Sequence, residues 1–467
     1  MSFFIPRIVL AALKGGSGKT ILSLGLAASW KDRGFRVAAF KKGPDFIDAG
    51  WLSFAADRPC RNLDPFMMND RQILESFVSN SKKSDISLVE GNRGLYDGLD
   101  VDGSCSTAEL AKLLNAPIVL VVDVTMTTRT VGAIVMGCQV FDRAVNIAGV
   151  ILNRVAGSRQ EKIIRSSIEK YCGLKVLGSV PKLKKNLFPE RHMGLVPCQE
   201  REHSEKSVVW AKEAVEKGID LEAIMDVAKS AGKIETDLQE EGTMHSSISM
   251  DKRPRIGFIL DRSFWFYYPE NLEILEKMGA QLVKIDSISN HEIPPLDALY
   301  IGGGFPECQA GALADNKAFL MSLKDSIEKG MPVYAECGGL MYLGESLKFD
   351  GKSYEMVGAL PMEFFLEKRP QGHGYTVLEV DRENPYYPVG QVLKGHEFHY
   401  SRPVVAKGES LISAFAVKRG YGVDGVRDGI CRKNLLATYT HIHAAGNPKW
   451  ADGIIRAASA FMKKQFF

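Results

Sequence analysis

Several features that would place the chain in a specialised class are missing from its 467 residues. The eight cysteines form no C-x-x-C pair, which argues against a metal-binding knuckle or a disulfide framework. No apolar run reaches the roughly 18 residues of a membrane span, and no charged-then-apolar leader precedes the first apolar run. We therefore expect a cytoplasmic protein that does not contact a membrane.

The charge balance argues against another class. A formal net charge of +3 is too small, on a chain of this size, to hold nucleic acid by bulk electrostatics, so we expect no nucleic-acid partner. Anionic ligands must instead be bound by local clusters of charge. With 45% hydrophobic and 25% charged residues, the chain is long enough for two or three domains with full cores.

The most informative stretch is a glycine-rich segment at 14–20. It follows an apolar run at 7–12 and precedes a run whose apolar residues recur every three or four positions, which predicts a strand, a phosphate-binding loop and a helix. The glycines allow backbone N–H groups to turn toward a phosphate, next to the positive end of the helix. We expect the nucleotide-binding residues to be Lys14, Gly15, Gly16, Ser17, Gly18, Lys19 and Thr20.

This segment departs from the ordinary phosphate-loop pattern, because Leu13 stands where the first glycine should be. It resembles the variant K-G-G-x-G-K-[ST], which occurs in partition ATPases, dethiobiotin synthetases and their relatives. Lys19 is expected to reach the terminal phosphates of ATP, and the Thr20 hydroxyl to hold Mg²⁺.

The rest of the first half alternates apolar runs with helical stretches, a rhythm typical of a parallel sheet covered on both faces. The further runs lie at 36–40, 86–90, 117–123, 147–153 and 176–180. Chemistry in such sheets collects at the carboxyl ends of the strands. We assign Asp45 and Glu90 to Mg²⁺ on this basis, with an N-cap or turn carboxylate as the alternative for each.

Four more motifs, at 42–48, 61–64, 90–98 and 189–195, make the chain resemble the cobyrinate a,c-diamide synthases, whose amino half is similar to dethiobiotin synthetase. The resemblance implies that Asp48 and Asp97 face the substrate and the transferred phosphate. It also places Asn153 near the adenine ring, with a plain loop asparagine as the alternative. Arg191 and His192 would bind either nucleotide or substrate, with a structural histidine as the alternative for His192.

The apolar pattern fails between 232 and 253, a polar and acidic stretch that we interpret as a linker. The predicted organisation is an α/β P-loop domain at 1–231, the linker at 232–253, and a second α/β domain at 254–467.

A second candidate site is centred on Cys337. An apolar strand is predicted to end there, two glycines follow, and an apolar helix begins. A helix N-terminus and a nearby imidazole lower the pKa of a thiol, so the position suits a nucleophile. The segment 301–307 offers backbone N–H groups for an oxyanion, and His441 and His443 lie on the same side of an extended segment.

These segments resemble a class I glutamine amidotransferase domain of the cobyric-acid-synthase type, with a flavodoxin-like fold. The resemblance implies that Cys337 attacks L-glutamine and that His441 is the base, with His443 in reserve. Many such enzymes carry a carboxylate two residues beyond the histidine, and here that position is His443, so the group that orients His441 is unassigned. The motif at 394–401 would place His396, Glu397 and His399 on the face between the domains.

The combined expectation is ATP- and Mg²⁺-dependent, glutamine-hydrolysing amidation of the a and c acetate groups of cobyrinic acid or a related tetrapyrrole. The alternatives are a Ni-sirohydrochlorin a,c-diamide synthase, a partition-type ATPase, and a pseudo-amidotransferase that only binds partners. The partition reading leaves the second half of the chain without a role. The sequence leaves open whether the chain forms a homodimer.

Overall fold

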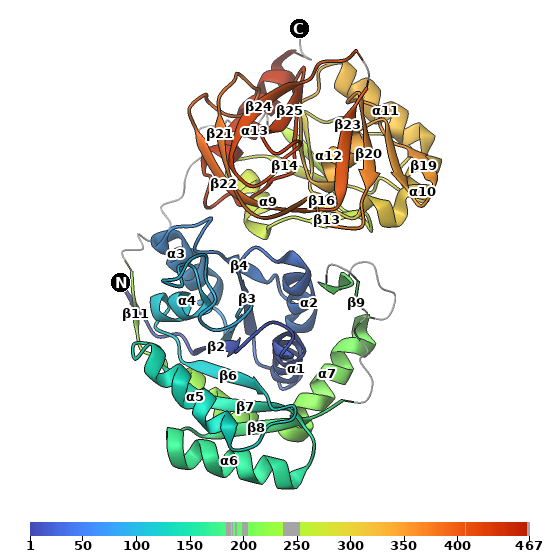
Figure 1. Cartoon of the computed structure of the whole chain (residues 1–467). Coiled ribbons are helices and arrows are strands. Elements are labelled where there is room, and N and C mark those ends of the chain that lie inside the picture. Colours follow the sequence, from blue (N-terminus) through green and yellow to red (C-terminus); the bar gives the residue numbers. More distant parts are fainter. Residues whose placement is uncertain are drawn as a thin grey trace. The chain divides into compact units, whose positions relative to one another are not determined.

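The computed structural model describes residues 1–183, 188, 190–191, 194–198, 204–236, 253–406 and 408–464. His192 and most of the predicted linker, residues 237–252, lie outside the described residues. The chain divides into two compact units, Met1–Glu240 and Glu241–Phe467 (Figure 1). Among the described residues, no helix combines the length and the apolar character needed to cross a membrane.

The first unit is built on a seven-stranded, fully parallel sheet. This arrangement confirms the predicted parallel sheet. In spatial order the strands are β4 (Arg61–Leu63), β3 (Val37–Lys42), β5 (Ile86–Glu90), β2 (Arg7–Ala12), β6 (Ile118–Asp123), β7 (Ile147–Val155) and β8 (Val176–Pro181).

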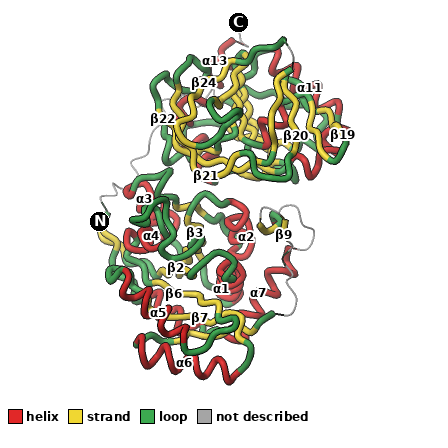
Figure 2. Tube along the Cα trace, viewed as in Figure 1, coloured by secondary structure: helices red, strands yellow, loops and turns green. Residues whose placement is uncertain are grey.

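Helices cover both faces of this sheet because alternate strand residues point to opposite sides. One face packs against α1 (Lys19–Asp32), α2 (Phe46–Ala56), α7 (Ser204–Gly218) and α8 (Leu221–Lys229). On the other face, Phe40 of β3 contacts Phe77 of α3 (Asp70–Ser81), with ring centroids 4.8 Å apart. The remaining helices are α4 (Thr107–Leu113), α5 (Thr130–Phe141) and α6 (Ser158–Cys172) (Figure 2).

Short strands complete the first unit. β9 (Glu190–Arg191) pairs with β10 (Gly194–Leu195), and β1 (Ser2–Phe3) pairs antiparallel with β11 (Ile234–Glu235). β11 lies inside the stretch predicted as linker, and its pairing with β1 attaches it to the first unit. The sequence analysis did not predict this strand, because two residues are too few to show an alternation of apolar and polar positions.

The second unit contains a ten-stranded mixed sheet. Its parallel half consists of β14 (Gln281–Ile285), β12 (Arg255–Ile259), β15 (Ala298–Ile301), β17 (Val333–Glu336) and β26 (Leu435–Thr438). Its antiparallel half continues with β25 (Arg427–Arg432), β24 (Ile412–Arg419), β21 (Gly372–Val380), β22 (Val392–His399) and β27 (His441–Ile442).

Smaller elements surround this sheet. β13 (Phe264–Phe266) pairs with β16 (Gly303–Gly304), and a four-stranded sheet has the order β19 (Lys352–Glu355), β18 (Ser346–Phe349), β20 (Met362–Leu366), β23 (Ser401–Val405). The helices are α9 (Pro269–Lys277), η2 (Pro306–Gln309), α10 (Ala310–Asp315), α11 (Lys317–Glu328), α12 (Gly338–Leu343) and α13 (Lys449–Lys464). The unit is therefore α/β, as predicted.

The antiparallel half of the large sheet curls back on itself. β26 and β27 are joined only by Tyr439 and Thr440, yet four strands separate them in the pairing order. A flat sheet could not satisfy both conditions, so these strands close into a ring. The closure pairs His396 of β22 with His441 of β27, residues that are far apart in sequence.

A buried carboxylate holds the connection between β26 and β27. Asp428 accepts hydrogen bonds from Thr438 Oγ1 (2.7 Å), Thr440 Oγ1 (3.3 Å) and the backbone N–H of Tyr439 (3.1 Å). This connection leads directly into His441. Asp428 therefore fixes the position from which that histidine projects.

We predict that Asp428→Ala lowers the free energy of unfolding of the second unit by about 3 kcal/mol, because it leaves several buried donors without an acceptor. Urea unfolding followed by circular dichroism measures the change. The exposed Asp325→Ala in α11 serves as control and should stay within about 0.5 kcal/mol of the parent. Equal stability of the two variants would contradict the assigned role.

Candidate active sites

The loop before α1 is shaped to receive an anion. Gly16 and Gly18 have φ of 72° and 90°, the left-handed region that favours glycine, and α1 begins directly afterwards at Lys19. No side chain caps this helix, and its first turn contains no acidic residue. The first backbone N–H groups of α1 are therefore available to a phosphate, and the helix dipole favours negative charge there.

Two residues of β7 hold this loop in place. Asn153 donates from Nδ2 to the Ser17 carbonyl oxygen at 2.7 Å, and a Cβ on Gly18 would come within 2.2 Å of the same nitrogen. Arg154 donates to the Gly16 carbonyl at 2.9 Å. Asn153 thus contacts the phosphate loop in this structure, and its expected contact with an adenine ring stays a prediction.

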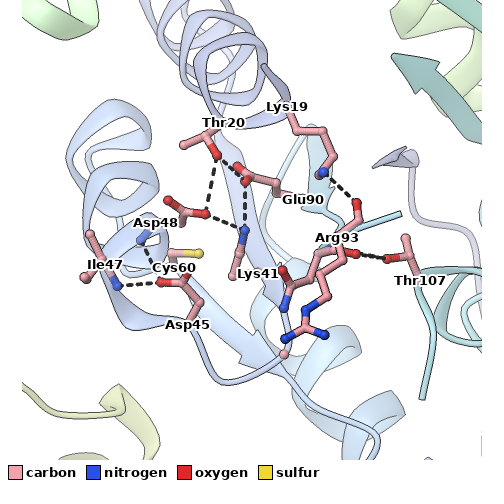
Figure 3. A network of polar contacts seen from close by, with 12 residues as sticks. Lys19, Thr20, Lys41, Asp45, Ile47, Asp48, Cys60, Glu90, Arg93 and Thr107 are labelled. Carbon is pink, nitrogen blue, oxygen red and sulfur yellow. Dashed lines mark hydrogen bonds and ion pairs between the residues drawn. The ribbon is translucent and has the colours of Figure 1, made fainter. Parts of the chain in front are cut away.

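A cluster of charged side chains lies beside the loop (Figure 3). Lys41 Nζ contacts Asp48 Oδ2 at 2.6 Å and Glu90 Oε1 at 2.8 Å. Thr20 Oγ1 donates to Glu90 Oε1 at 2.8 Å. Because Lys41 and Glu90 are register partners on neighbouring parallel strands, the sheet itself brings these two residues together.

Burial and charge compete in this cluster. The side chains of Lys41 and Glu90 are 2% and 0% exposed. Burial raises the pKa of Glu90. Burial also lowers the pKa of Lys41, but Asp48 and Glu90 outweigh that effect and raise it above its ordinary value. Burial likewise acts to raise the pKa of Asp48, and Lys41 outweighs it and lowers that pKa. Lys41 thus stays charged and compensates the carboxylates.

Two other predicted carboxylates have local structural partners. Asp45 is the N-cap of α2 and accepts from the backbone N–H groups of Ile47 (2.9 Å) and Asp48 (3.1 Å). Burial and the neighbouring Asp48 raise the pKa of Asp45 to about 7. Asp97 is exposed and accepts from the Gly94 N–H at 2.8 Å. The structure therefore places Asp48, and not Asp45, in hydrogen-bond range of Thr20, with 3.4 Å between Oγ1 and Oδ2.

Lys41 is a residue that the sequence prediction did not assign to the site. Its position at the end of an apolar strand, beside other strands that end in carboxylates, was the available signal. Lys19 donates to the Arg93 carbonyl at 2.7 Å, next to the same cluster. Within the described ranges, no group of three or more His, Cys, Asp or Glu residues is arranged to hold a metal ion.

The second site is a sharp turn at the end of β17. Cys337 has φ 47° and ψ −100°, a strained conformation for a residue with a side chain, and α12 begins at the next residue. A Cβ on Gly338 would come within 2.8 Å of the Gly304 carbonyl oxygen. The glycine segment expected to bind an oxyanion therefore packs against the turn. Within it, the Gly302 N–H is already donated to Tyr267 Oη at 2.8 Å.

The resting thiol differs from the expectation. Burial raises the pKa of Cys337 above its ordinary value, and the nearby carboxylates of Glu307 and Glu336 act in the same direction. The expected lowering is therefore wrong for the resting protein. A helix of one or two turns contributes too little field to offset the loss of solvent. A thiolate then forms only if a base removes the proton.

His441 packs against the glycine segment that borders this turn and is almost fully buried. Its ring stacks on Phe266 with centroids 4.2 Å apart, and a Cβ on Gly303 would come within 2.3 Å of its Cε1. Burial, and then the charge of His399, lower the pKa of His441 to about 3. His441 therefore rests neutral, which is the form a base requires.

The reserve histidine has a different setting. The backbone N–H of Ala445 donates to His443 Nδ1 at 3.3 Å, and the ring packs on Tyr268 with centroids 4.7 Å apart. His443 thus supports the turn that follows β27. His441, in contrast, packs against the glycine segment that borders the Cys337 turn.

Residues of the motif at 394–401 contact other parts of the second unit. Glu397 accepts from the backbone N–H groups of Tyr421 (2.5 Å) and Gly422 (2.8 Å). His399 stacks on Tyr439 with centroids 3.5 Å apart. These contacts give the motif a structural part in the closed ring of strands.

Comparison with known families covers both units. Residues 8–196 match the CobQ/CobB/MinD/ParA nucleotide binding domain, and residues 255–449 match the CobB/CobQ-like glutamine amidotransferase domain. A protein of Magnetococcus marinus named cobyrinate a,c-diamide synthase is 42% identical over 98% of each chain. One of Archaeoglobus fulgidus with the same name is 42% identical over 99% of this chain and 98% of its own.

We predict that Lys41→Met lowers the free energy of unfolding of the first unit by about 3–5 kcal/mol, because Asp48 and Glu90 stay buried without their cation. Urea unfolding at two pH values measures the loss. Without Lys41, burial raises the pKa of Asp48 and Glu90, so these carboxyl groups take up protons as pH falls. The loss of stability should therefore be smaller at pH 5 than at pH 8.

Lys112→Met is the matched control for this measurement. Lys112 also contacts two carboxylates, Glu109 (2.7 Å) and Asp142 (2.8 Å), but its side chain is 29% exposed. Its loss should cost about 1 kcal/mol or less. An equal cost for the two lysines would contradict the importance of burial.

Proposed function

The chain belongs to the cobyrinate a,c-diamide synthase family, and on that premise we propose that it amidates the a and c acetate groups of cobyrinic acid, using ATP and L-glutamine. Members of this family are glutamine-hydrolysing ligases, with a nucleotide-binding domain followed by an amidotransferase domain. The observation that carries the proposal is the similarity over nearly the whole length of both chains, because it includes both sites together.

The first unit would activate the acid. A carboxylate does not react with ammonia at neutral pH, because its carbonyl is electron-rich and oxide is a poor leaving group. Transfer of the γ-phosphoryl group of ATP to the acetate would give an acyl phosphate and ADP. The phosphate loop and Lys19 would hold the triphosphate, and Asp48 and Asp97 would lie toward the acetate and the transferred group.

The residues beside Thr20 fit a magnesium ion. Glu90 is fully buried, and its Oε2 has no hydrogen-bond partner among the described residues, so an oxygen ligand is available next to the Thr20 hydroxyl. Mg²⁺ prefers one or two such protein ligands, with water and phosphate oxygens completing its shell. Thr20 and Glu90 would hold it, with Asp45 as the further ligand expected from the sequence. The ion would neutralise phosphate charge.

Lys41 would act on the same side of the reaction. Its ammonium group lies between Asp48 and Glu90, where negative charge on a γ-phosphate or an acetate would attract it. We therefore add Lys41 to the residues that would stabilise the transferred phosphate.

The second unit would supply ammonia. Cys337 would attack the side-chain amide of glutamine while His441 takes the thiol proton and passes it to the leaving nitrogen, giving a thioester and NH₃. Water would then release glutamate. The ammonia must reach the acyl phosphate without taking up a proton, which requires a path shielded from water. Attack on the acyl phosphate would form the amide and expel phosphate.

We predict that the purified protein transfers labelled nitrogen from glutamine to the tetrapyrrole. With ATP, Mg²⁺, cobyrinic acid and amide-¹⁵N glutamine, mass spectrometry should show two labelled amides in the product. Parallel reactions with Ni- and Co-sirohydrochlorin test the alternative ring. Amidation of these rings but not of cobyrinic acid would overturn the proposed substrate, and product without nucleotide consumption would overturn the mechanism.

We predict that Cys337→Ala loses glutamine-dependent synthesis, by about 10³-fold or more, because the proposed thioester forms on this thiol. Synthesis from ammonium chloride at alkaline pH should remain. Coupled assays of ADP release with either nitrogen donor measure the two activities. Unchanged use of glutamine by the variant would remove Cys337 from the proposal.

A further inference from the structure

A carboxylate faces the histidine that would act as base. His441 Nδ1 lies 3.7 Å from Glu336 Oε2, and their side chains are 3% and 2% exposed. Among the described residues this Nδ1 has no hydrogen-bond partner. The position two residues beyond His441, where many amidotransferases carry a carboxylate, is occupied by His443.

We propose that Glu336 is the positioning residue for His441, and that the residue directly before the nucleophile supplies the third member of the catalytic group. This inference rests on the proposed glutaminase activity of Cys337. It places the carboxylate on β17 instead of after β27. The same chemical role is thus taken by a residue from another part of the chain.

The fold fixes the Glu336 carboxylate from several sides. Glu336 and Thr438 are register partners on neighbouring strands, so the side chain reaches across to β27. There the Ile442 N–H donates to Oε1 at 3.2 Å, and Tyr300 Oη donates to Oε2 at 3.1 Å. Both oxygens are thereby held while one of them faces Nδ1. A small rotation of the imidazole would close 3.7 Å to a hydrogen bond, and such bonds are often long before substrate binds.

The proton count shows what this contact does. For His441 to accept the thiol proton at Nε2, its own proton must sit on Nδ1, and an acceptor there selects that tautomer. When Cys337 gives up its proton, His441 becomes an imidazolium and the ionised Glu336 compensates the charge. The proton then leaves from Nε2 with the amide nitrogen, and the pair returns to its starting state.

The pair also has a characteristic pH response. Burial raises the pKa of Glu336 to about 8, so the ionised carboxylate forms as pH rises through that value. Glu336 interacts with these titratable groups: Tyr267, Tyr300, Tyr334, Tyr387, Cys337 and His441. The charged or titratable groups near His441 are His396, His399 and Glu397. Burial keeps the four tyrosines protonated, so Glu336 and His441 govern the response together.

The test compares two isosteric variants in the full-length protein. Glu336→Gln keeps the shape of the side chain but removes its charge, and should lower kcat for glutamine hydrolysis by about 10²-fold or more with little change in KM. The rise of wild-type glutaminase activity through about pH 8 should disappear in this variant. Ammonia-dependent amidation should stay unchanged, because that reaction bypasses Cys337.

Glu270→Gln is the matched control. Glu270 Oε2 lies 3.7 Å from His443 Nε2, the same separation as in the proposed pair. This variant should keep the wild-type rate and pH profile. Loss of glutaminase in Glu270→Gln with a normal Glu336→Gln would overturn the inference and transfer the role of base to His443.

A second variant keeps the inference testable if Glu336→Gln does not fold. Tyr300→Phe removes one hydrogen bond to the carboxylate, which raises the pKa of Glu336, so the pH midpoint of glutaminase activity should move upward. An unchanged midpoint, or a Glu336→Gln variant with normal kcat and pH profile, would overturn the inference alone. A wild-type protein without glutaminase activity would overturn the proposed function as well.

Discussion

Both candidate sites depend on one constraint. Ionisable groups are buried at or near the ends of β-strands, and each must either be paired with an opposite charge or stay neutral. A parallel sheet covered on both faces withdraws its carboxyl ends from water, so an isolated charge there is costly. In the first unit, Lys41 meets this cost for Asp48 and Glu90. In the second unit, His441 rests neutral, and Glu336 ionises only as pH rises through about 8.

These two solutions suit different chemistry. A permanent ammonium group between carboxylates gives a fixed field, which can stabilise negative charge developing on a phosphoryl group. A carboxylate beside a neutral imidazole instead lets the imidazole take up a proton, which a thiol nucleophile needs. The raised pKa of the Cys337 thiol fits the second arrangement, because the thiolate then forms only when a base such as His441 accepts the proton.

Closure of the antiparallel strands connects fold and site in the second unit. The ring from β26 to β27 brings the histidine-containing strands β22 and β27 together, and Asp428 holds the segment before His441. The carboxylate that faces His441 comes from β17, which belongs to the parallel half of the sheet. The site therefore needs both halves of the sheet to form.

The sequence by itself determined the phosphate loop, the parallel sheet of the first unit, the α/β character of the second and the position of Cys337, because local spacing and composition encode all four. It also determined the family through motifs spread over the chain. Only the tertiary structure decided that Lys41 compensates Asp48 and Glu90, that Asp45 caps α2, and that Glu336 faces His441. The Lys41–Glu90 and Glu336–His441 contacts join strands that are distant in sequence, so strand order and side-chain burial set them. The Asp45 cap is local, but the sequence allowed a metal-binding role for the same carboxylate.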